Sequence, residues 1–175
     1  MVRSTGLPPV IDGSSRVIVL GSMPSVISMK LGQYYGNPRN QFWTIVYSLF
    51  GMEPEPDYRD RLAFLKQRKI ALWDVIESCE RRGSLDSSIE HERTNDLKAL
   101  FRRYPGIGLV VFNGLKAQRS FWTNASLDES IERRLRFITM PSTSPANTAR
   151  ADLKRAEWMK VRRYLDEPRT AHLSL

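Results

Sequence analysis

Two segments near the N-terminus combine residue types that could bind a flat ring. The first is GSMPS at 21–25, which ends the apolar run 17–20. Its small residues and proline let the backbone approach a ligand closely. The second is YYGNPRNQFW at 34–43, in which two tyrosines and several amides precede a helical pattern. Aromatic rings stack on flat molecules and amides hydrogen-bond to their edges, so a pocket is indicated. A plain strand, a loop and a core-packed helix start are the alternative.

Four apolar runs are each followed by small or polar residues. The runs are Arg16–Leu20, Ile70–Val75, Leu109–Phe112 and Arg136–Met140, and each predicts a parallel strand. After them come, in turn, GSMP at 21–24, Asp74 with 78–84, Asn113 with Gly114, and PSTSPAN at 141–147. Ligands bind beyond the carboxyl ends of such strands, so we expect these residues at one edge of a sheet. Any fold of this class needs turns there, so this clustering alone does not decide the function.

Helical patterns of apolar residues lie between these runs, starting near Phe42, Asp57 and Leu97. A last helical pattern carries Arg150, Lys154, Arg155, Arg162 and Arg163. Most of these basic residues are expected on a solvated face, with one or two touching phosphate. The alternation of strands and helices predicts an α/β fold in which helices cover both faces of a parallel sheet.

The chain has 175 residues, 41% of them apolar, which is enough for one well-packed core. We expect residues 1–15, rich in Gly, Pro and Ser, to form an extended arm. Residues 16–167 are predicted to be a single domain and 168–175 a C-terminal tail that frays. The net charge of +8 makes a polyanion the first partner to consider, although a basic protein without a nucleic-acid role fits the charge equally well.

Metal and disulfide chemistry find little support in the sequence. Cys79 is the single cysteine, and His91 and His172 are the only histidines, far apart and outside any zinc-binding pattern. No intramolecular disulfide can form, and we expect neither a metal nor an organic cofactor. Without a long apolar run or a signal pattern, the protein is expected to be intracellular, in the cytoplasm and at the nucleoid when acting, with no membrane partner.

Five motifs in order give the chain a family resemblance. They are GSMPS at 21–25, YYGNPRNQFW at 34–43, ALWDVIESCERRGSLDSSI at 71–89, VVFNG at 110–114 and MPSTSPAN at 140–147. Together they resemble the uracil-DNA glycosylase superfamily, most closely its hypoxanthine-DNA (DNA-deoxyinosine) glycosylase branch. The resemblance spans about Val17 to Leu165 and implies a three-layer α/β/α sandwich on a four-stranded parallel sheet.

The departures from the superfamily pattern shift the expected chemistry. Related mismatch glycosylases have a water-positioning Asn where this chain has Met23, and a thioether cannot orient water as an amide does. In the hypoxanthine branch the Asn of the Pro-Arg-Asn segment compensates, and Asn40 matches that position. The classical uracil enzymes place a His in the last motif, and none occurs in 140–147.

The resemblance and the residue chemistry together give expected roles. Asn40 is the expected catalytic residue, with capping of the following helix as its alternative. Tyr35 is expected to stack on the flipped base, with core packing as its alternative. The expected base-binding residues are Gly21, Ser22, Met23, Pro24, Tyr35, Asp74 and Asn113, and a turn-supporting role is the preferred interpretation of Asn113.

Asp74 stands where the uracil-reading relatives carry an Asn. An ionised carboxylate accepts a hydrogen bond from N1–H of hypoxanthine but cannot donate to the bare N1 of adenine. Backbone N–H groups of 21–25 could face O6. Capping of a turn, or an ion pair with Arg81 or Arg82, is nearly as well supported.

The expected DNA contacts come from two segments. Ser142, Thr143 and Ser144 offer groups to phosphates, and Pro145 with Ala146 could fill the vacated stack. Arg39 is expected at the pocket rim, near a phosphate or the base, or in a local salt bridge. The implied partner is double-stranded DNA carrying a deaminated base, bound by a monomer.

The function that follows is hydrolysis of the N-glycosidic bond of a deaminated base, hypoxanthine first, to leave an abasic site. No lysine lies inside the five motifs, which predicts a monofunctional glycosylase without lyase activity. A uracil or mismatch glycosylase and a DNA-lesion binding module without catalysis are the alternatives.

Overall fold

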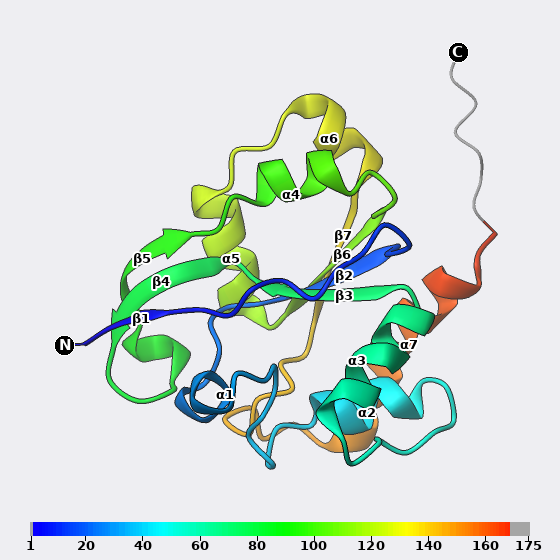
Figure 1. Ribbon diagram of the computed structural model, residues 1–175, viewed down its shortest axis with the longest axis horizontal. Helices are drawn as coiled ribbons and strands as arrows, with labels where there is room; N and C mark the ends of the chain where they lie inside the picture. Colours follow the sequence, from blue (N-terminus) through cyan, green and yellow to red (C-terminus); the bar gives the residue numbers. More distant parts are fainter. Residues whose placement is uncertain (1, 169–175) are drawn as a thin grey trace.

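The computed structural model describes residues 2–168, and its centre is a four-stranded parallel sheet (Figure 1). The strands are β2 (Val17–Gly21), β3 (Ile70–Asp74), β6 (Leu109–Asn113) and β7 (Arg136–Met140), in the order β3-β2-β6-β7. All neighbouring pairs are parallel. The four strands predicted from apolar runs are therefore confirmed, and β2 at the centre is buried along its whole length, as its uniformly apolar sequence requires.

Helices cover both faces of this sheet. One face carries α2 (Phe42–Ser48), α3 (Tyr58–Gln67) and α7 (Ala151–Asp166), which pack on Val17 and Val19. The other carries α4 (Leu97–Arg103), α5 (Leu115–Asn124) and α6 (Glu129–Arg134), which pack on Ile18 and Leu20. Successive residues of a strand point to opposite faces, so the four apolar residues of β2 serve two cores. The result is the expected three-layer α/β/α sandwich (Figure 1).

A second sheet of three antiparallel strands lies beside the first, in the order β1-β4-β5. Its strands are β1 (Val2–Thr5), β4 (Ile76–Arg81) and β5 (Glu90–Thr94). Residues 1–15 were expected to be an extended arm, and Val2–Thr5 is extended but paired with β4. Val10 also pairs with Leu72 of β3, so the segment belongs to the domain. Most of the expected tail, 169–175, lies outside the described residues.

Two short elements complete the described chain: α1 (Val26–Leu31) and the 3-10 turn η1 (Asp86–Ser88). Helix α1 begins at the end of the GSMPS segment, where Ser25 caps it by accepting from the N–H of Ser28. Both elements lie near the carboxyl ends of the central strands, where they border a pocket. No helix in 2–168 is long and apolar enough to cross a membrane.

Candidate active site

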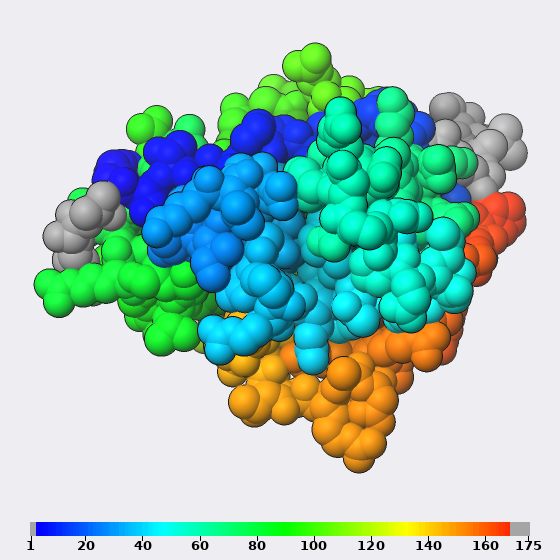
Figure 2. Space-filling model, turned by 60° about the horizontal axis from the view of Figure 1, so that its bottom comes forward, coloured from blue at the N-terminus to red at the C-terminus, as the bar shows by residue number. Residues whose placement is uncertain are grey.

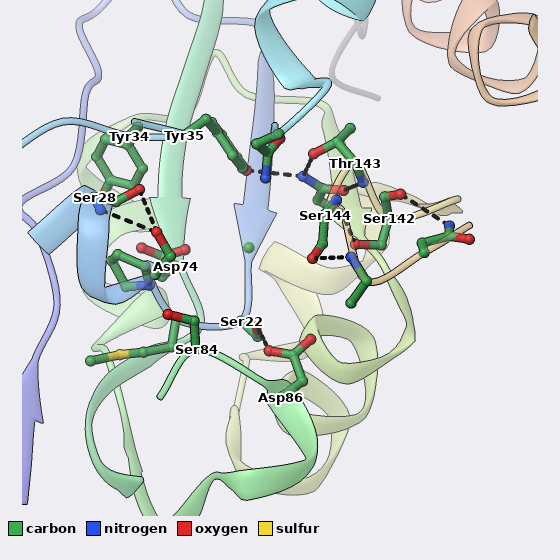
Figure 3. Close-up of a pocket in the computed structure, with 18 of the residues that line it drawn as sticks. Ser22, Ser28, Tyr34, Tyr35, Asp74, Ser84, Asp86, Ser142, Thr143 and Ser144 are labelled. Carbon is green, nitrogen blue, oxygen red and sulfur yellow. Dashed lines mark hydrogen bonds between the residues drawn. The ribbon is translucent and has the colours of Figure 1, made fainter. Parts of the chain in front are cut away.

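A pocket of about 280 Å³ opens at the carboxyl edge of the central sheet. This volume is close to the lower end of the range for small-molecule binding sites, and it suits one flat heterocycle. All five motifs contribute to its walls (Figure 3). The lining residues that had been predicted from the sequence are Gly21, Ser22, Met23, Pro24, Tyr35, Asn40, Asp74, Asn113, Ser142, Thr143, Ser144 and Ala146. The lining residues to which no individual role had been assigned are Ser25, Ser28, Tyr34, Ser84, Leu85, Asp86 and Asn147.

Asp74 is the buried charge of this pocket, with 4% of its surface exposed. It ends β3 next to Gly21 of β2, and a Cβ at position 21 would lie 2.5 Å from Asp74 Oδ1. The other oxygen, Oδ2, is buried and has no hydrogen-bond partner among the described residues. Asp74 lines the pocket, so a buried carboxylate whose hydrogen bonding is incomplete forms part of the pocket wall.

The pKa of Asp74 is raised to about 7, chiefly because burial disfavours the charged form. Arg81 opposes this shift and Asp86 adds to it. No salt bridge joins Asp74 to Arg81 or Arg82 within the described residues, so the ion-pair alternative finds no contact in the structure. Its main-chain oxygen, and not its carboxylate, holds the turn, by accepting from Asn95 Nδ2 at 2.8 Å.

Tyr35 lines the pocket and also packs against the protein core. Its ring stacks on Phe42 with centroids 3.9 Å apart and an interplanar angle of 18°. Its hydroxyl accepts a hydrogen bond from Asn113 Nδ2 at 3.2 Å. The backbone of Tyr35 is left-handed, with φ of 54°, a strained conformation for a bulky residue that is typical of functional sites. Core packing and a pocket-facing role therefore coexist in this side chain.

The side chain of Asn113, at the end of β6, forms hydrogen bonds that connect it to Tyr35 and to Thr143 in the pocket wall. Besides Tyr35, its Nδ2 donates to Thr143 Oγ1 at 2.9 Å, and its Oδ1 accepts from the Thr143 N–H at 2.9 Å. These bonds tie the end of β6 to the loop after β7. Both amide hydrogens of Asn113 are engaged, so its side chain has no free donor for a base.

Thr143 differs from its expected role. It was predicted to contact phosphate, but it is fully buried, and its N–H and hydroxyl are both bonded to Asn113. Its N–H is therefore not free to bind a phosphate, and no part of its side chain is exposed. Ser142 and Ser144 do line the pocket, and Ser142 Oγ accepts from the N–H of Ser144 at 3.2 Å. Pro145 and Ala146 are exposed at the rim, as a stack-filling role requires.

Asn40 lines the pocket and also holds the start of α2. Its Oδ1 accepts from the N–H of Phe42 at 2.9 Å, a bond of the kind that the capping alternative requires, although the N-cap position of α2 is Gln41. This bond uses the carbonyl side of the amide and orients the side chain, while Nδ2 makes no bond to the described residues. Arg39, next to it, is exposed. Capping and a role at the pocket are therefore compatible.

Met23 packs against Ile76 and Cys79 and is 7% exposed, so it forms an apolar wall of the pocket. The neighbouring Pro24 offers its main-chain oxygen to Arg81 Nη2. A buried arginine therefore stabilises the GSMPS segment through a hydrogen bond to its main chain. Arg81 Nε and Nη1 have no partner among the described residues, and burial lowers the pKa of this guanidinium.

The family model of the uracil DNA glycosylase superfamily matches residues 8–166. The chain belongs to that superfamily.

Two relatives of this superfamily member span almost the same length. A hypoxanthine DNA glycosylase of Methanosarcina barkeri is 34% identical over 163 residues, and one of Methanosarcina acetivorans is 36% identical over 162 residues. Each alignment covers 91% of this chain and 98% of the relative. A solution NMR structure of a candidate uracil DNA glycosylase from Methanosarcina acetivorans is similar with a TM-score of 0.81 and 34% identity, covering 95% of this chain and 100% of that one.

The exposure of one basic residue of this glycosylase fold was predicted wrongly from the sequence. Lys154 of α7 was grouped with a solvated face, but it is 1% exposed. Its Nζ donates to Gln41 Oε1 at 2.9 Å and to the main-chain oxygen of Asn147 at 2.7 Å, and burial lowers its pKa. It thereby links the Asn40 segment to the loop after β7. Its position one turn before Trp158, on the buried side of α7, is the signal that could have revealed this.

Proposed function

We propose that this chain is a monofunctional DNA glycosylase that excises hypoxanthine from double-stranded DNA and leaves an abasic site. The observation that carries the proposal is Asp74, which lines a pocket of heterocycle size and has a buried carboxylate oxygen, Oδ2, with no hydrogen-bond partner among the described residues. The superfamily membership and the names of the two archaeal relatives support both the reaction and the base.

Base choice follows from hydrogen-bond polarity. Hypoxanthine carries a proton on N1, which an ionised Asp74 accepts, whereas N1 of adenine offers only a lone pair. Main-chain N–H groups of 21–25 would face O6. Adenine would also leave the Asp74 carboxylate buried and unpaired, and an unpaired buried charge is costly. Guanine shares the N1–H and O6 of hypoxanthine but adds a 2-amino group, which a tight pocket would exclude.

The reaction needs the nucleotide to leave the base stack, because the pocket is a recess in the protein. In the recess, Tyr35 would offer its ring to the base. Asn40 would hold a water below C1′ of the sugar. The bond between C1′ and N9 breaks with its electron pair going to the base, the water oxygen bonds to C1′, and the water proton is released while the base is protonated.

The DNA contacts of this proposal lie around the pocket mouth. The net charge of +8 favours a polyanion. Arg39, Ser142 and Ser144 would contact phosphates next to the flipped nucleotide, and Pro145 with Ala146 would enter the stack. One copy of the chain holds all of these groups, so a monomer would suffice.

The test is a cleavage assay on four matched duplexes that carry hypoxanthine, uracil, xanthine or mismatched thymine, with alkali revealing abasic sites. Hypoxanthine should be cut with the highest kcat/KM. Preferred cutting of uracil or thymine would make the chain a mismatch glycosylase. Tight binding to the hypoxanthine duplex with no abasic product would make it a binding module.

Two variants test the water-positioning role of Asn40. Asn40→Ala removes both the helix cap and the amide, while Asn40→Asp keeps an acceptor for the Phe42 N–H. Both should lower kcat by about 100-fold, the scale of losing one positioned polar group in a transition state. Wild-type turnover in both would remove Asn40 from the catalytic role. Asn124→Ala, an exposed asparagine on α5, is the matched control.

A further inference from the structure

The segment 82–88, which joins β4 to β5, borders the pocket through Ser84, Leu85 and Asp86. Two hydrogen bonds fix it to the GSMPS side of the pocket. Ser22 Oγ donates to Asp86 Oδ1 at 2.6 Å, and the N–H of Val26 donates to Ser84 Oγ at 2.9 Å. Figure 3 shows Ser84 and Asp86 along a different border of the pocket from Ser142 and Ser144.

The backbone of Leu85 is also held from within the segment. Its main-chain oxygen accepts from the N–H of Ser88 at 3.1 Å and from Ser88 Oγ at 2.7 Å. Ile89, next in the chain, packs on the cluster of Met23, Ile76 and Cys79. The backbone of Leu85 therefore lies in a turn that is held by hydrogen bonds within the segment and by hydrogen bonds to the GSMPS side of the pocket.

The side chain of Leu85 is 58% exposed although its backbone is fixed. The large apolar side chains that are exposed in 2–168 are Ile27, Leu31, Met52, Leu85, Leu115, Trp122 and Leu153. Of these, Leu85 alone lines the pocket. An apolar side chain held in water at the mouth of a polar pocket gains free energy when a partner covers it.

We propose that Leu85 is a second stack-filling residue, which enters the duplex beside the flipped nucleotide from a different border of the pocket than the 141–147 loop. This rests on the proposed function and deepens it. A flipped nucleotide leaves a gap of one base in the stack, and glycosylases and other kinking proteins fill such gaps with apolar wedges.

The 141–147 loop alone fills this gap poorly. The residue of that loop tip that lines the pocket is Ala146, whose side chain is a single methyl, and Pro145 next to it is exposed but does not line the pocket. Leu85 supplies the missing apolar volume. Figure 2 shows the green segment that includes 82–88 and the orange segment that follows 141–147 on the same face of the molecule, where DNA would have to lie.

The experiment compares hypoxanthine in a duplex with hypoxanthine in the same single strand. A single strand has no opposite base and no continuous stack to fill, so a wedge acts only on the duplex. Leu85→Asn keeps the size of the side chain but makes it polar, and Leu85→Met keeps it apolar. Leu115→Ala, at an equally exposed leucine that does not line the pocket, is the matched control.

Leu85→Asn should lower kcat/KM on the duplex by about tenfold, the loss expected for one apolar side chain that is no longer buried. Its activity on the single strand, and both activities of Leu85→Met and Leu115→Ala, should stay within about twofold of wild type. An equal loss on duplex and single strand would overturn the proposal, because Leu85 would then contact the base inside the pocket. Wild-type activity of Leu85→Asn on both substrates would overturn it as well.

A fluorescence measurement gives an independent readout. The duplex carries 2-aminopurine opposite a 2′-fluoro-deoxyinosine, whose fluorine slows cleavage, and 2-aminopurine brightens when its stacking is disturbed. Wild type and Leu85→Met should raise the emission on binding, and Leu85→Asn should raise it less at saturation. Equal emission for all three proteins would overturn the proposal. A wild type that cuts none of the substrates would contradict the proposed function itself.

Discussion

Asp74 lies against Gly21 so closely that no side chain fits between them. A Cβ at position 21 would stand 2.5 Å from Asp74 Oδ1, well inside van der Waals contact. The two residues end the neighbouring strands β2 and β3 in register. Glycine at position 21 therefore decides where the carboxylate of Asp74 can lie.

Gly21→Ala should displace the Asp74 carboxylate and lower kcat/KM on hypoxanthine duplex by about 100-fold, since a shift of about 1 Å at a reacting site has this scale. Steady-state cleavage kinetics measure the effect. Gly13→Ala is the control, because nothing lies within 4 Å of a Cβ at that position. Equal activity of both variants would show that the contact between Gly21 and Asp74 is unimportant.

Selectivity against adenine should depend on pH through Asp74, whose pKa is about 7. Above this pH the ionised group accepts from N1–H of hypoxanthine. Below it the neutral acid can donate to N1 of adenine, so discrimination falls. The charged and titratable groups that influence this site are Arg81, Asp86, Tyr34 and Tyr35. The ratio of kcat/KM for hypoxanthine and adenine should rise from pH 5.5 to 8.5, and Asp74→Asn should give a flat ratio.

Asp74 should also make the stability of the protein fall with rising pH. Its folded pKa of about 7 lies above the ordinary value of 3.8, so between these values the folded state keeps a proton that the unfolded state has lost. The free energy of unfolding therefore decreases through this window, by about 4 kcal/mol at most. Asp74→Asn should be more stable than wild type in urea at pH 8 and gain less at pH 4. A pH-independent difference would contradict the burial of an ionisable Asp74.

Arg81 should set the pH at which Asp74 ionises. Its positive charge lowers the pKa of Asp74 against the effect of burial, so Arg81→Met should shift the midpoint of the selectivity profile to higher pH. The profile of the hypoxanthine to adenine ratio against pH measures this. Arg82→Met, at an exposed neighbour, should leave the midpoint unchanged. The same midpoint in both variants would mean that Arg81 acts only through its bond to Pro24.

Asn113→Ala should weaken the whole pocket wall. It removes the bonds to Tyr35 and Thr143 and leaves the buried N–H of Thr143 without a partner. We expect a loss of about 2 kcal/mol in the free energy of unfolding and a higher KM for duplex DNA. Urea unfolding and steady-state kinetics measure the two effects. Asn124→Ala, which removes bonds of an exposed asparagine, should cost less than about 0.5 kcal/mol. An unchanged KM would show that the hydrogen bonds of Asn113 stabilise the pocket wall but do not affect DNA binding.

Much of the fold could be predicted from the order of residue types. The strands β2, β3 and β6 are mostly apolar because both of their faces are covered, and such runs stand out in any sequence. The edge strand β7 is more mixed, but its apolar residues were still enough to predict it. The second sheet could not be found in this way. Strand β5 reads Glu-His-Glu-Arg-Thr because it is a partly exposed edge strand, and charged residues at an edge hide the strand pattern while preventing further pairing.

The family, the central sheet and the segments that gather at its carboxyl edge could be predicted from the residues alone, because these features depend on local residue patterns and their order. The surroundings of each side chain are known from the folded structure. Thr143 and Lys154 are buried there, Asp74 Oδ2 has no partner among the described residues, and Leu85 lines the pocket. Burial and pairing depend on residues that are distant in the chain, which local patterns do not record.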